Sequence, residues 1–294
     1  MKILVLGGTR FFGMKTVEHL IEKNHEVTIA TRGNTEHPFG NQVNHIILDV
    51  QDNTHAGWKE IVEKQWDAVF SNITYTKEDA ELLIDKFTNI TDHVYFTSSM
   101  AVYSGDKDGY VEEDFDPKSY EIEPNIEVNY GEGKCQAEQV LFTKAPFAVT
   151  SFRFPIVLDE DDYTKRLHYY VEKAIKDEKI YFKKTDVKVN YVKGTTAADS
   201  IVWAIENQKE GIYNVSSADA ITIATFVEWL DEAVSNAISV EYSDKETSPF
   251  STAHDQYLIS DKIAGEGFKL SNLKDWLKPL IKVLVAEMKK DYAN

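Results

Sequence analysis

A tyrosine and a lysine four positions apart, Tyr130 and Lys134 in the segment "VNYGEGKCQAE", are the pair in this chain best suited to acid–base chemistry. At the start of a helix, residues i and i+4 lie on one face, so a phenol and an ammonium group can serve one site. A neighbouring cation stabilises phenolate and lowers the pKa of a tyrosine from its ordinary value of about 10. We therefore expect Tyr130 to exchange a proton with an alcohol or carbonyl oxygen. The alternative is an exposed helix face without chemistry.

Hydroxyl side chains end the apolar segment "VYFTSSMAVY". Thr97, Ser98 and Ser99 stand at the carboxyl end of an expected core strand, where ligands bind in open α/β sheets. A serine hydroxyl there is predicted to hydrogen-bond the substrate oxygen beside Tyr130, and Thr97 and Ser98 are expected next to a cofactor. Serines also end strands for ordinary turn reasons, so the prediction depends on the combination with Tyr130 and Lys134.

A glycine-rich loop follows the first apolar segment, in "VLGGTRFFG". Glycines between a strand and a helix allow a tight turn and leave backbone N–H groups free to hold a pyrophosphate. The loop residues predicted to bind a dinucleotide are Gly7, Gly8, Thr9, Arg10, Phe11, Phe12 and Gly13. A turn without a ligand is the alternative.

The end of the second expected strand indicates which dinucleotide would bind. An NAD site usually has Asp or Glu there to accept a hydrogen bond from the ribose 2′-hydroxyl. This chain has Thr31 and Arg32 instead, in "TIATRG". A guanidinium group can hold a 2′-phosphate bidentately, and Arg10 leaves the neighbouring loop. We predict that Arg10 and Arg32 select NADP, with NAD as the alternative if both arginines are only solvated.

Short apolar segments alternate with longer amphipathic ones through the first half of the chain. Segments rich in Val, Ile and Phe on this rhythm predict a parallel sheet with helices on both faces, a Rossmann-type doubly wound α/β fold. Strands are expected at residues 2–6, 25–30, 43–50, 67–72, 93–99 and 147–154, and helices at 12–23, 56–64, 77–87 and 131–144.

The pattern is less regular after Pro155. Strands are expected at 187–192 and 211–216, and helices at 165–176, 196–206, 223–234 and near the C-terminus, the last starting or bending at Pro279. We predict an NAD(P)-binding domain over residues 1–158, whose sheet is joined by later strands from about 186–216. Residues 159–294 are predicted to form a smaller substrate-binding lobe.

Composition limits the classes of partner. The chain has 294 residues, 43% of them hydrophobic, and a formal charge of −17, which argues against nucleic acid and anionic membranes as partners. A single cysteine, Cys135, fits a reducing compartment, and no segment reads as a signal peptide or reaches the roughly 20 apolar residues of a membrane helix. We expect a cytoplasmic protein. The eight histidines lack metal-ligand spacing, so no metal is expected.

The segments "GGTRFFG", "SSMAVY", "YGEGKCQAE" and "FRFPIV" together resemble the extended or atypical short-chain dehydrogenase/reductases of the NAD(P)-dependent epimerase/dehydratase superfamily. The likeness covers most of the chain. The resemblance implies Ser99, Tyr130 and Lys134 as the catalytic set, with Lys134 also holding the nicotinamide ribose, and it suggests a homodimer. Further residues that it places beside the cofactor are Asp49 and Val50 at the adenine, Ser71 and Asn72 after the fourth strand, and Pro155 and Ile156 near the nicotinamide.

Two departures from the family bear on the substrate. The nucleotide-sugar dehydratases that this chain resembles carry an Asp-Glu pair after the catalytic hydroxyl residue. This chain has Met100 and Ala101 at those positions, so dehydration is not expected. Sugar-nucleotide epimerases resemble one another in an R-P-x-N-V-Y-G-P segment, of which Arg153 and Val157 remain.

An arginine that commonly grips the UDP phosphates in the family aligns near Val189, which carries no charge. Lys165 and Arg166 are candidates to replace it, with an exposed basic helix face as the alternative. The substrate is therefore expected to be small or sugar-like.

We predict an NADP-dependent oxidoreductase that transfers a hydride at a carbinol or carbonyl carbon. A first alternative is a redox-neutral UDP-sugar epimerase that retains its cofactor, since the same three residues serve both reactions. A second alternative is a cofactor-binding regulator or RNA-associated protein without catalysis.

Overall fold

In the computed structural model, which describes residues 1–245 and 247–293, the chain divides into two compact units. The first unit comprises Met1–Ser104, Glu112–Phe154 and Gly194–Val215. The second comprises Gly105–Val111, Pro155–Lys193 and the residues from Ser216 onward. The predicted boundary at residue 158 lies close to Phe154, and residues 194–215 of the first unit fall within the later contribution predicted from about 186–216.

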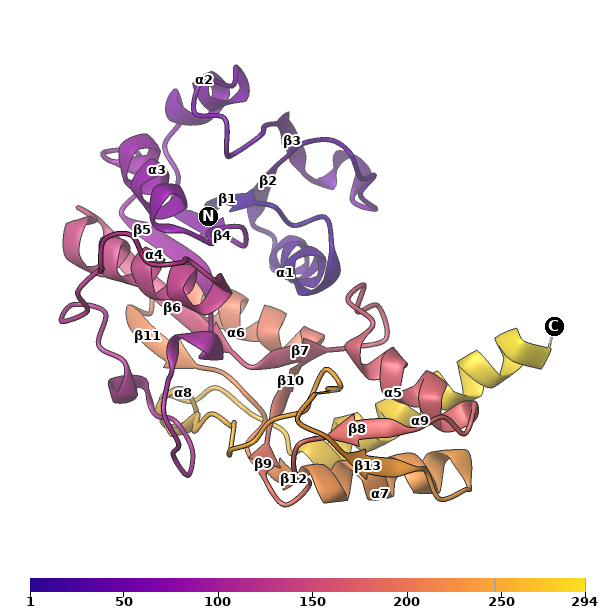
Figure 1. Ribbon diagram of the computed structural model, residues 1–294. Coiled ribbons are helices and arrows are strands. Elements are labelled where there is room, and N and C mark those ends of the chain that lie inside the picture. Colours follow the sequence, from indigo (N-terminus) through magenta and orange to yellow (C-terminus); the bar gives the residue numbers. More distant parts are fainter. Residues whose placement is uncertain (246, 294) are drawn as a thin grey trace. The chain divides into compact units, whose positions relative to one another are not determined.

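The first unit contains a seven-stranded parallel sheet with the strand order β11-β6-β5-β4-β1-β2-β3 (Figure 1). Its strands are β1 (Lys2–Leu6), β2 (Glu26–Thr31), β3 (Asn44–Ile47), β4 (Ala68–Ser71), β5 (His93–Ser99), β6 (Ala148–Phe154) and β11 (Gly211–Asn214). The chain adds β2 and β3 on one side of β1 and then β4 on the other. This reversal between β1 and β4 is the place where ligands bind in doubly wound sheets. The predicted Rossmann-type fold is confirmed.

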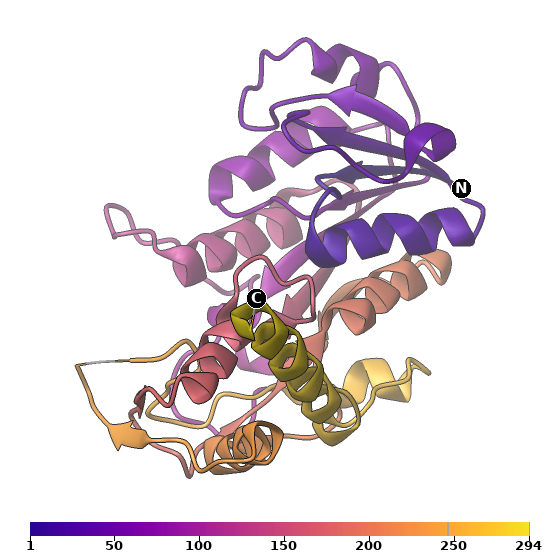
Figure 2. The same ribbon diagram turned by 90° about the vertical axis from the view of Figure 1, so that its right-hand side faces the viewer.

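Helices cover both faces of this sheet (Figures 1 and 2). One face carries α1 (Phe11–Glu22) packed beside α6 (Gly194–Glu206), and the other carries α3 (Lys77–Phe87) beside α4 (Tyr130–Lys144), with α2 (Gly57–Val62) next to α3. Because both faces are covered, the central strands are almost wholly buried: four of the five residues of β1 and all four of β4 are buried.

The second unit is built on helices and short strand pairs around an aromatic core. Its elements are β7 (Ile156–Leu158), α5 (Arg166–Ile175), β8 (Ile180–Phe182), β9 (Lys188–Val189), β10 (Tyr191–Lys193), β12 (Ile221–Thr222), α7 (Ile223–Val234), β13 (Val240–Tyr242), α8 (Asp261–Gly265) and α9 (Leu273–Ala293). β7 pairs with β10, β8 with β13 and β9 with β12. In the core, the Tyr170 ring contacts the rings of Phe182, Phe226 and Phe250.

The prediction for residues 186–216 is wrong in part. Of the strands expected there, only β11 joins the seven-stranded sheet, while β9 and β10 pair with β12 and β7. The expected strand at 187–192 is interrupted at Asn190, whose buried side chain donates to Ser216 Oγ (3.0 Å) and to the Leu258 carbonyl (2.8 Å). The side chain thus binds neighbouring chain segments at the point where an unbroken strand was expected.

Of the two alternatives predicted for Pro279, the start of the helix is wrong, and a bend at Pro279 stays a prediction. α9 begins at Leu273 and contains Pro279 in its interior, because buried residues on both sides of the proline, such as Leu277 and Ile281, pack into one core. No helix among residues 1–245 and 247–293 is both long and apolar enough to cross a lipid bilayer.

The turn from β1 to α1 generates a prediction about stability. Gly8 has φ of +88°, and a Cβ there would lie 2.9 Å from methyl groups of the buried Val5 and Val17. Gly40 also has positive φ (+51°), but nothing lies within 4 Å of its Cβ position. We expect Gly8→Ala to lower the free energy of unfolding by about 2–4 kcal/mol and Gly40→Ala by about 1 kcal/mol in chemical denaturation. Equal losses in the two variants would contradict the packing argument.

Candidate functional site

The loop between β1 and α1 is shaped to receive an anion. Gly7 and Gly8 both have positive φ, and a Cβ at Gly13 would lie 2.7 Å from Asn72 Nδ2. α1 starts without a side-chain cap and without an acidic residue in its first turn. Its first backbone N–H groups are therefore not satisfied by a side-chain cap, and the positive end of the helix dipole lies at the glycine loop. These features fit the pyrophosphate of a dinucleotide.

Thr9, Phe11 and Phe12 complete the predicted loop. Phe11 is buried, and the Phe12 ring packs edge-on against Phe154 with centroids 5.6 Å apart. Because both aromatic side chains pack within the unit, what they present to a pyrophosphate is their backbone.

The two arginines predicted to select NADP belong to neighbouring segments. Arg10 Nη2 donates to Thr35 Oγ1 (3.3 Å), which brings its guanidinium to the loop that carries Arg32. Thr31 Oγ1 lies 2.8 Å from His45 Nε2 at the end of β2. Both arginines are exposed. The hydrogen bond places the Arg10 guanidinium beside the loop that follows β2, and selection of a 2′-phosphate by Arg10 and Arg32 stays a prediction.

The other residues predicted beside the cofactor lie at the ends of neighbouring strands. Asn72 follows β4, and its Oδ1 accepts a hydrogen bond from Thr97 Oγ1 on β5 (2.8 Å). Ser71 is buried at the end of β4, while Asp49 and Val50 follow β3. The structure therefore joins Asn72 and Thr97 directly beside the glycine loop.

Lys134 is an ionisable residue of the first unit whose side chain is shielded from solvent. Its side chain is fully buried, and its Nζ donates to the carbonyl oxygens of Thr74 (2.5 Å) and Thr97 (2.7 Å). The Nζ lies 4.6 Å from the ring centroid of Tyr75 and 5.7 Å from that of Tyr130. Burial lowers the pKa of Lys134 to about 7, against the opposing effect of two nearby carboxylates.

Tyr130 contrasts with Lys134 in exposure. It is the first residue of α4 and 55% exposed, whereas Lys134 lies one turn further and is buried. Asn129 caps the helix by accepting a hydrogen bond from the Glu132 backbone N–H (3.0 Å). A phenol at this end of the helix lies near the positive end of the helix dipole and near Lys134 Nζ.

Two glycines allow the start of α4 to approach the ends of the strands. A Cβ at Gly131 would lie 2.7 Å from the Ala101 carbonyl oxygen, and one at Gly133 would lie 2.5 Å from the Tyr75 carbonyl oxygen. Any side chain at either position would push the helix away. The sequence "YGEGK" is thus what brings Tyr130 and Lys134 to the strand ends.

The two neighbouring serines of β5 have different partners. Ser98 Oγ donates to Glu138 Oε1 (2.6 Å), so its hydroxyl is part of a buried network. Ser99 Oγ accepts a hydrogen bond from the Ala101 backbone N–H (3.1 Å), which leaves its hydroxyl hydrogen free to donate elsewhere. Side chains alternate along a strand, so only one of the two can face the network.

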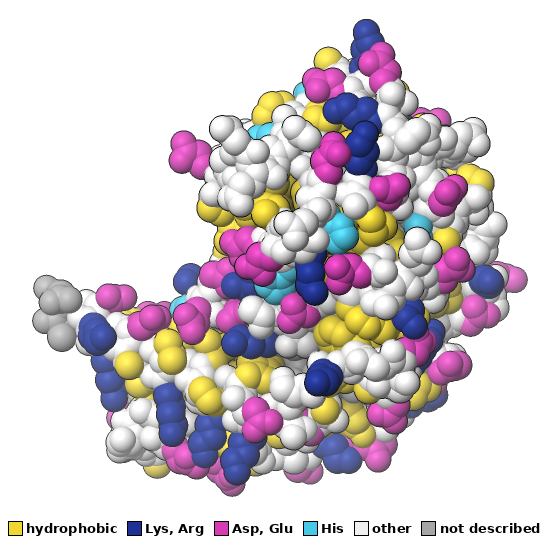
Figure 3. Space-filling view, turned by 180° about the vertical axis from the view of Figure 1, so that it is seen from behind, with side chains coloured by type: hydrophobic (Ala, Val, Ile, Leu, Met, Phe, Trp, Pro, Cys, Tyr) yellow, Lys and Arg dark blue, Asp and Glu magenta, His cyan; other side chains and the backbone are white. Residues whose placement is uncertain are grey.

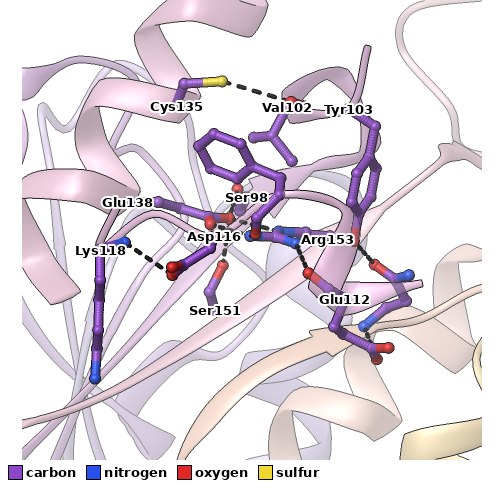
Figure 4. A network of polar contacts seen from close by, with 12 residues as sticks. Ser98, Val102, Tyr103, Glu112, Asp116, Lys118, Cys135, Glu138, Ser151 and Arg153 are labelled. Carbon is purple, nitrogen blue, oxygen red and sulfur yellow. Dashed lines mark hydrogen bonds and ion pairs between the residues drawn. The ribbon is translucent and has the colours of Figure 1, made fainter. Parts of the chain in front are cut away.

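The network around Glu138 is centred on an ion pair with Arg153 (Figure 4). Glu138 Oε2 and Arg153 Nη2 are 2.5 Å apart, and both side chains are fully buried. Glu138 Oε1 also accepts from Ser98 and Ser151, while Arg153 donates to Tyr103 Oη. The guanidinium further donates to two loop carbonyls, at residues 112 and 115. The pair therefore ties α4, β5, β6 and the loop after β5 together.

Sequence reasoning missed three contributors to this region: Glu138, Thr74 and Tyr75. Glu138 had a detectable signal, because positions 130, 134 and 138 recur every four residues on one face of a helix. Thr74 contributes a backbone carbonyl and Tyr75 a ring face, and neither contribution depends on a recognisable motif.

Some predicted residues lie in the second unit. Pro155 and Ile156 come immediately after β6, and their placement near a nicotinamide stays a prediction. Val189 is buried. Lys165 precedes α5, with its Nζ 3.3 Å from His168 Nε2, and Arg166 is the first residue of α5. Binding of substrate phosphates by Lys165 and Arg166 likewise stays a prediction.

Comparison with known proteins finds a sequence match to a family of NAD-dependent enzymes at the N-terminal end of the chain. Residues 3–79 match the model of the NAD dependent epimerase/dehydratase family. A curated relative, the chloroplast stem-loop binding protein of 41 kDa b from Arabidopsis thaliana, is 22% identical over 238 residues. This match covers 75% of the chain, which spans 60% of the length of that relative.

Solved structures match the fold over nearly the whole chain. UDP-glucose 4-epimerase from Thermotoga maritima, solved with UDP-glucose, is 16% identical with a TM-score of 0.73, covering 99% of this chain and 100% of that one. UDP-glucuronic acid 4-epimerase from Bacillus cereus, in complex with NAD, is 15% identical with a TM-score of 0.74, covering 99% and 100%. At these identities the likeness establishes the fold.

The buried lysine generates a prediction about pH. An unfolded lysine has a pKa of about 10.4, and burial lowers that of folded Lys134 to about 7. Between these values the unfolded chain binds one proton more than the folded chain, so the free energy of unfolding rises with pH, by at most about 1.4 kcal/mol per unit. We expect the stability of wild type relative to Lys134→Met to rise from pH 7 to pH 9 in chemical denaturation.

The control for this measurement is Lys144→Met, which changes an exposed lysine at the end of the same helix. Its stability difference from wild type should stay flat over the same range. A flat or falling difference for Lys134→Met would show that Lys134 does not lose its charge on folding.

Proposed function

This chain is a member of the NAD(P)-dependent epimerase/dehydratase superfamily, and from that premise we propose that it is a redox-neutral epimerase acting on a secondary alcohol of a sugar-like substrate. The observation that carries the proposal is the pairing of exposed Tyr130 with buried Lys134 at the start of α4. A phenol that reaches solvent, with a lysine side chain held one helical turn behind it, suits reversible proton exchange on an alcohol.

Tyr130, Ser99 and Lys134 have separate roles in the proton transfer. When bound, the nicotinamide supplies hydride acceptance and hydride return. The Tyr130 phenolate accepts the proton of the substrate hydroxyl as the carbon is oxidised, and returns it when the carbonyl is reduced. Ser99 donates a hydrogen bond to the same oxygen and holds it in line. Lys134 stays in place and stabilises the phenolate.

The comparisons favour an epimerase over a net oxidoreductase. The solved structures most similar in fold include several UDP-sugar 4-epimerases, which favours redox-neutral inversion over net reduction. A net NADP-linked oxidation or reduction is the second candidate, because Ser99, Tyr130 and Lys134 serve it equally well. The missing basic residue at Val189 leaves Lys165 and Arg166 as the candidates for holding a UDP diphosphate.

An RNA-associated role is a third candidate, supported by the name of the curated relative. The charge of −17 opposes binding to a polyanion. On the face shown in Figure 3, basic side chains are interspersed with acidic ones. We therefore rank this role below catalysis.

Turnover tests the proposed function. We expect the purified protein to retain a nicotinamide dinucleotide through gel filtration and to interconvert UDP-glucose or UDP-N-acetylglucosamine with a C4 epimer, without net consumption of NADPH. Tyr130→Phe should lower kcat about 10²–10⁴-fold and keep the dinucleotide. Tyr292→Phe, which changes an exposed tyrosine of α9, is the control. Stoichiometric oxidation of NADPH during turnover would replace the epimerase with an oxidoreductase.

Dissociation constants test the proposed choice of NADP. We expect tighter binding of NADPH than of NADH, because β2 ends without an acid and Arg10 and Arg32 can hold the 2′-phosphate. Arg10→Ala and Arg32→Ala should each weaken NADPH binding about tenfold or more and leave NADH binding unchanged. Lys23→Ala, at the far end of α1, is the control. A preference of wild type for NADH would reject this choice.

A further inference from the structure

Tyr75 is an exposed aromatic residue on a tightly held backbone. Its N–H donates to Asp79 Oδ2 (2.8 Å), and its carbonyl oxygen lies so close to Gly133 that a Cβ there would be 2.5 Å away. The preceding carbonyl, that of Thr74, accepts from Lys134 Nζ. The side chain is 43% exposed, so a large part of its surface remains in contact with water.

The ring of Tyr75 faces the lysine. Its centroid lies 4.6 Å from Lys134 Nζ, closer than the 5.7 Å of the Tyr130 ring. An ammonium over an aromatic face is attracted by the negative face of the ring, and the attraction is stronger when the cation is desolvated. Lys134 is fully buried, so the condition for a strong interaction is met.

The charged groups around Lys134 are otherwise occupied. Glu138 and Asp79 are the carboxylates that favour the charged lysine. Glu138 is paired with Arg153 (2.5 Å), and Asp79 accepts from the backbone N–H groups of residues 75 and 76. Neither carboxylate is hydrogen-bonded to the ammonium, whose surroundings include two carbonyl oxygens, the nearer ring of Tyr75 and the more distant ring of Tyr130.

We propose that Tyr75 is a positioning residue for Lys134: the face of its ring holds the ammonium in its charged form against the carbonyls of Thr74 and Thr97. The consequence for catalysis, that Tyr75 sets the upper pH at which Tyr130 exchanges a proton, depends on the proposed function. The contact with Lys134 does not.

The test follows the protonation of Lys134 directly. The whole chain is labelled with ¹³C-lysine, the Cε resonance of Lys134 is identified by its loss in Lys134→Met, and its titration midpoint is read by NMR. We expect Tyr75→Leu to lower the midpoint by about one pH unit, while Tyr75→Phe, which keeps the ring face, stays within about 0.3 unit of wild type. Tyr242→Leu, at another exposed tyrosine, is the matched control and should not change it.

An unchanged midpoint in Tyr75→Leu would overturn the proposal, and so would a Tyr75→Phe variant that behaves like Tyr75→Leu. If Tyr75→Leu does not fold, Tyr75→Trp decides, because the stronger ring face of tryptophan should raise the midpoint. A midpoint that does not rise in Tyr75→Trp would reject the proposal.

Turnover separates this proposal from the proposed function. If the chain is an epimerase, Tyr75→Leu should move the alkaline limb of the kcat profile down by about one pH unit, with KM little changed. A shifted NMR midpoint in a protein without epimerase activity would reject the proposed function and support the role of Tyr75. If Tyr75→Leu leaves the NMR midpoint unchanged in a protein that is an active epimerase, the role of Tyr75 would be rejected and the proposed function supported.

Discussion

The buried ammonium of Lys134 is the constraint on which the candidate site depends. A cation removed from water is costly unless polar groups replace its hydration shell. The carbonyls of Thr74 and Thr97 do so at 2.5 and 2.7 Å, and both come from chain segments at the carboxyl ends of the central strands. The start of α4 can reach them only because Gly131 and Gly133 carry no side chain. The positions of the start of α4, the strand ends and Lys134 therefore depend on one another, and a change in any one of them disturbs the other two.

This arrangement places a buried lysine behind an exposed phenol. Lys134 is buried one turn behind Tyr130, whose phenol is exposed at the helix start. One turn further along the same face, Glu138 binds Arg153 and connects α4 to β6. The helix thus carries, at intervals of four residues, an exposed phenol, a buried lysine and a structural anchor. The exposed member is the one that a substrate can reach, which is what proton exchange on an alcohol requires.

Sequence patterns predicted the regular parts of the molecule and the residues with strong local signals. The alternation of apolar and amphipathic segments predicted the doubly wound parallel sheet, since strands covered on both faces are largely buried and rich in apolar residues. The spacing of Tyr130 and Lys134 predicted their common helix face. The split at Asn190 and the contribution of the Thr74 carbonyl could not be predicted, because both arise from contacts between segments distant in sequence. The ring of Tyr75 belongs to the same class, since an isolated exposed tyrosine has no pattern.

Isotope exchange during turnover tests the central claim most directly. The account requires that Tyr130 moves a proton only on the substrate oxygen, while the hydrogen on carbon leaves and returns as hydride. Epimerisation of a UDP-hexose in D₂O, followed by NMR, should therefore give a product with no solvent deuterium at the inverted carbon. Deuterium at that carbon would mean that a proton is abstracted from carbon, and the chemistry assigned to Tyr130 and Lys134 would be incorrect.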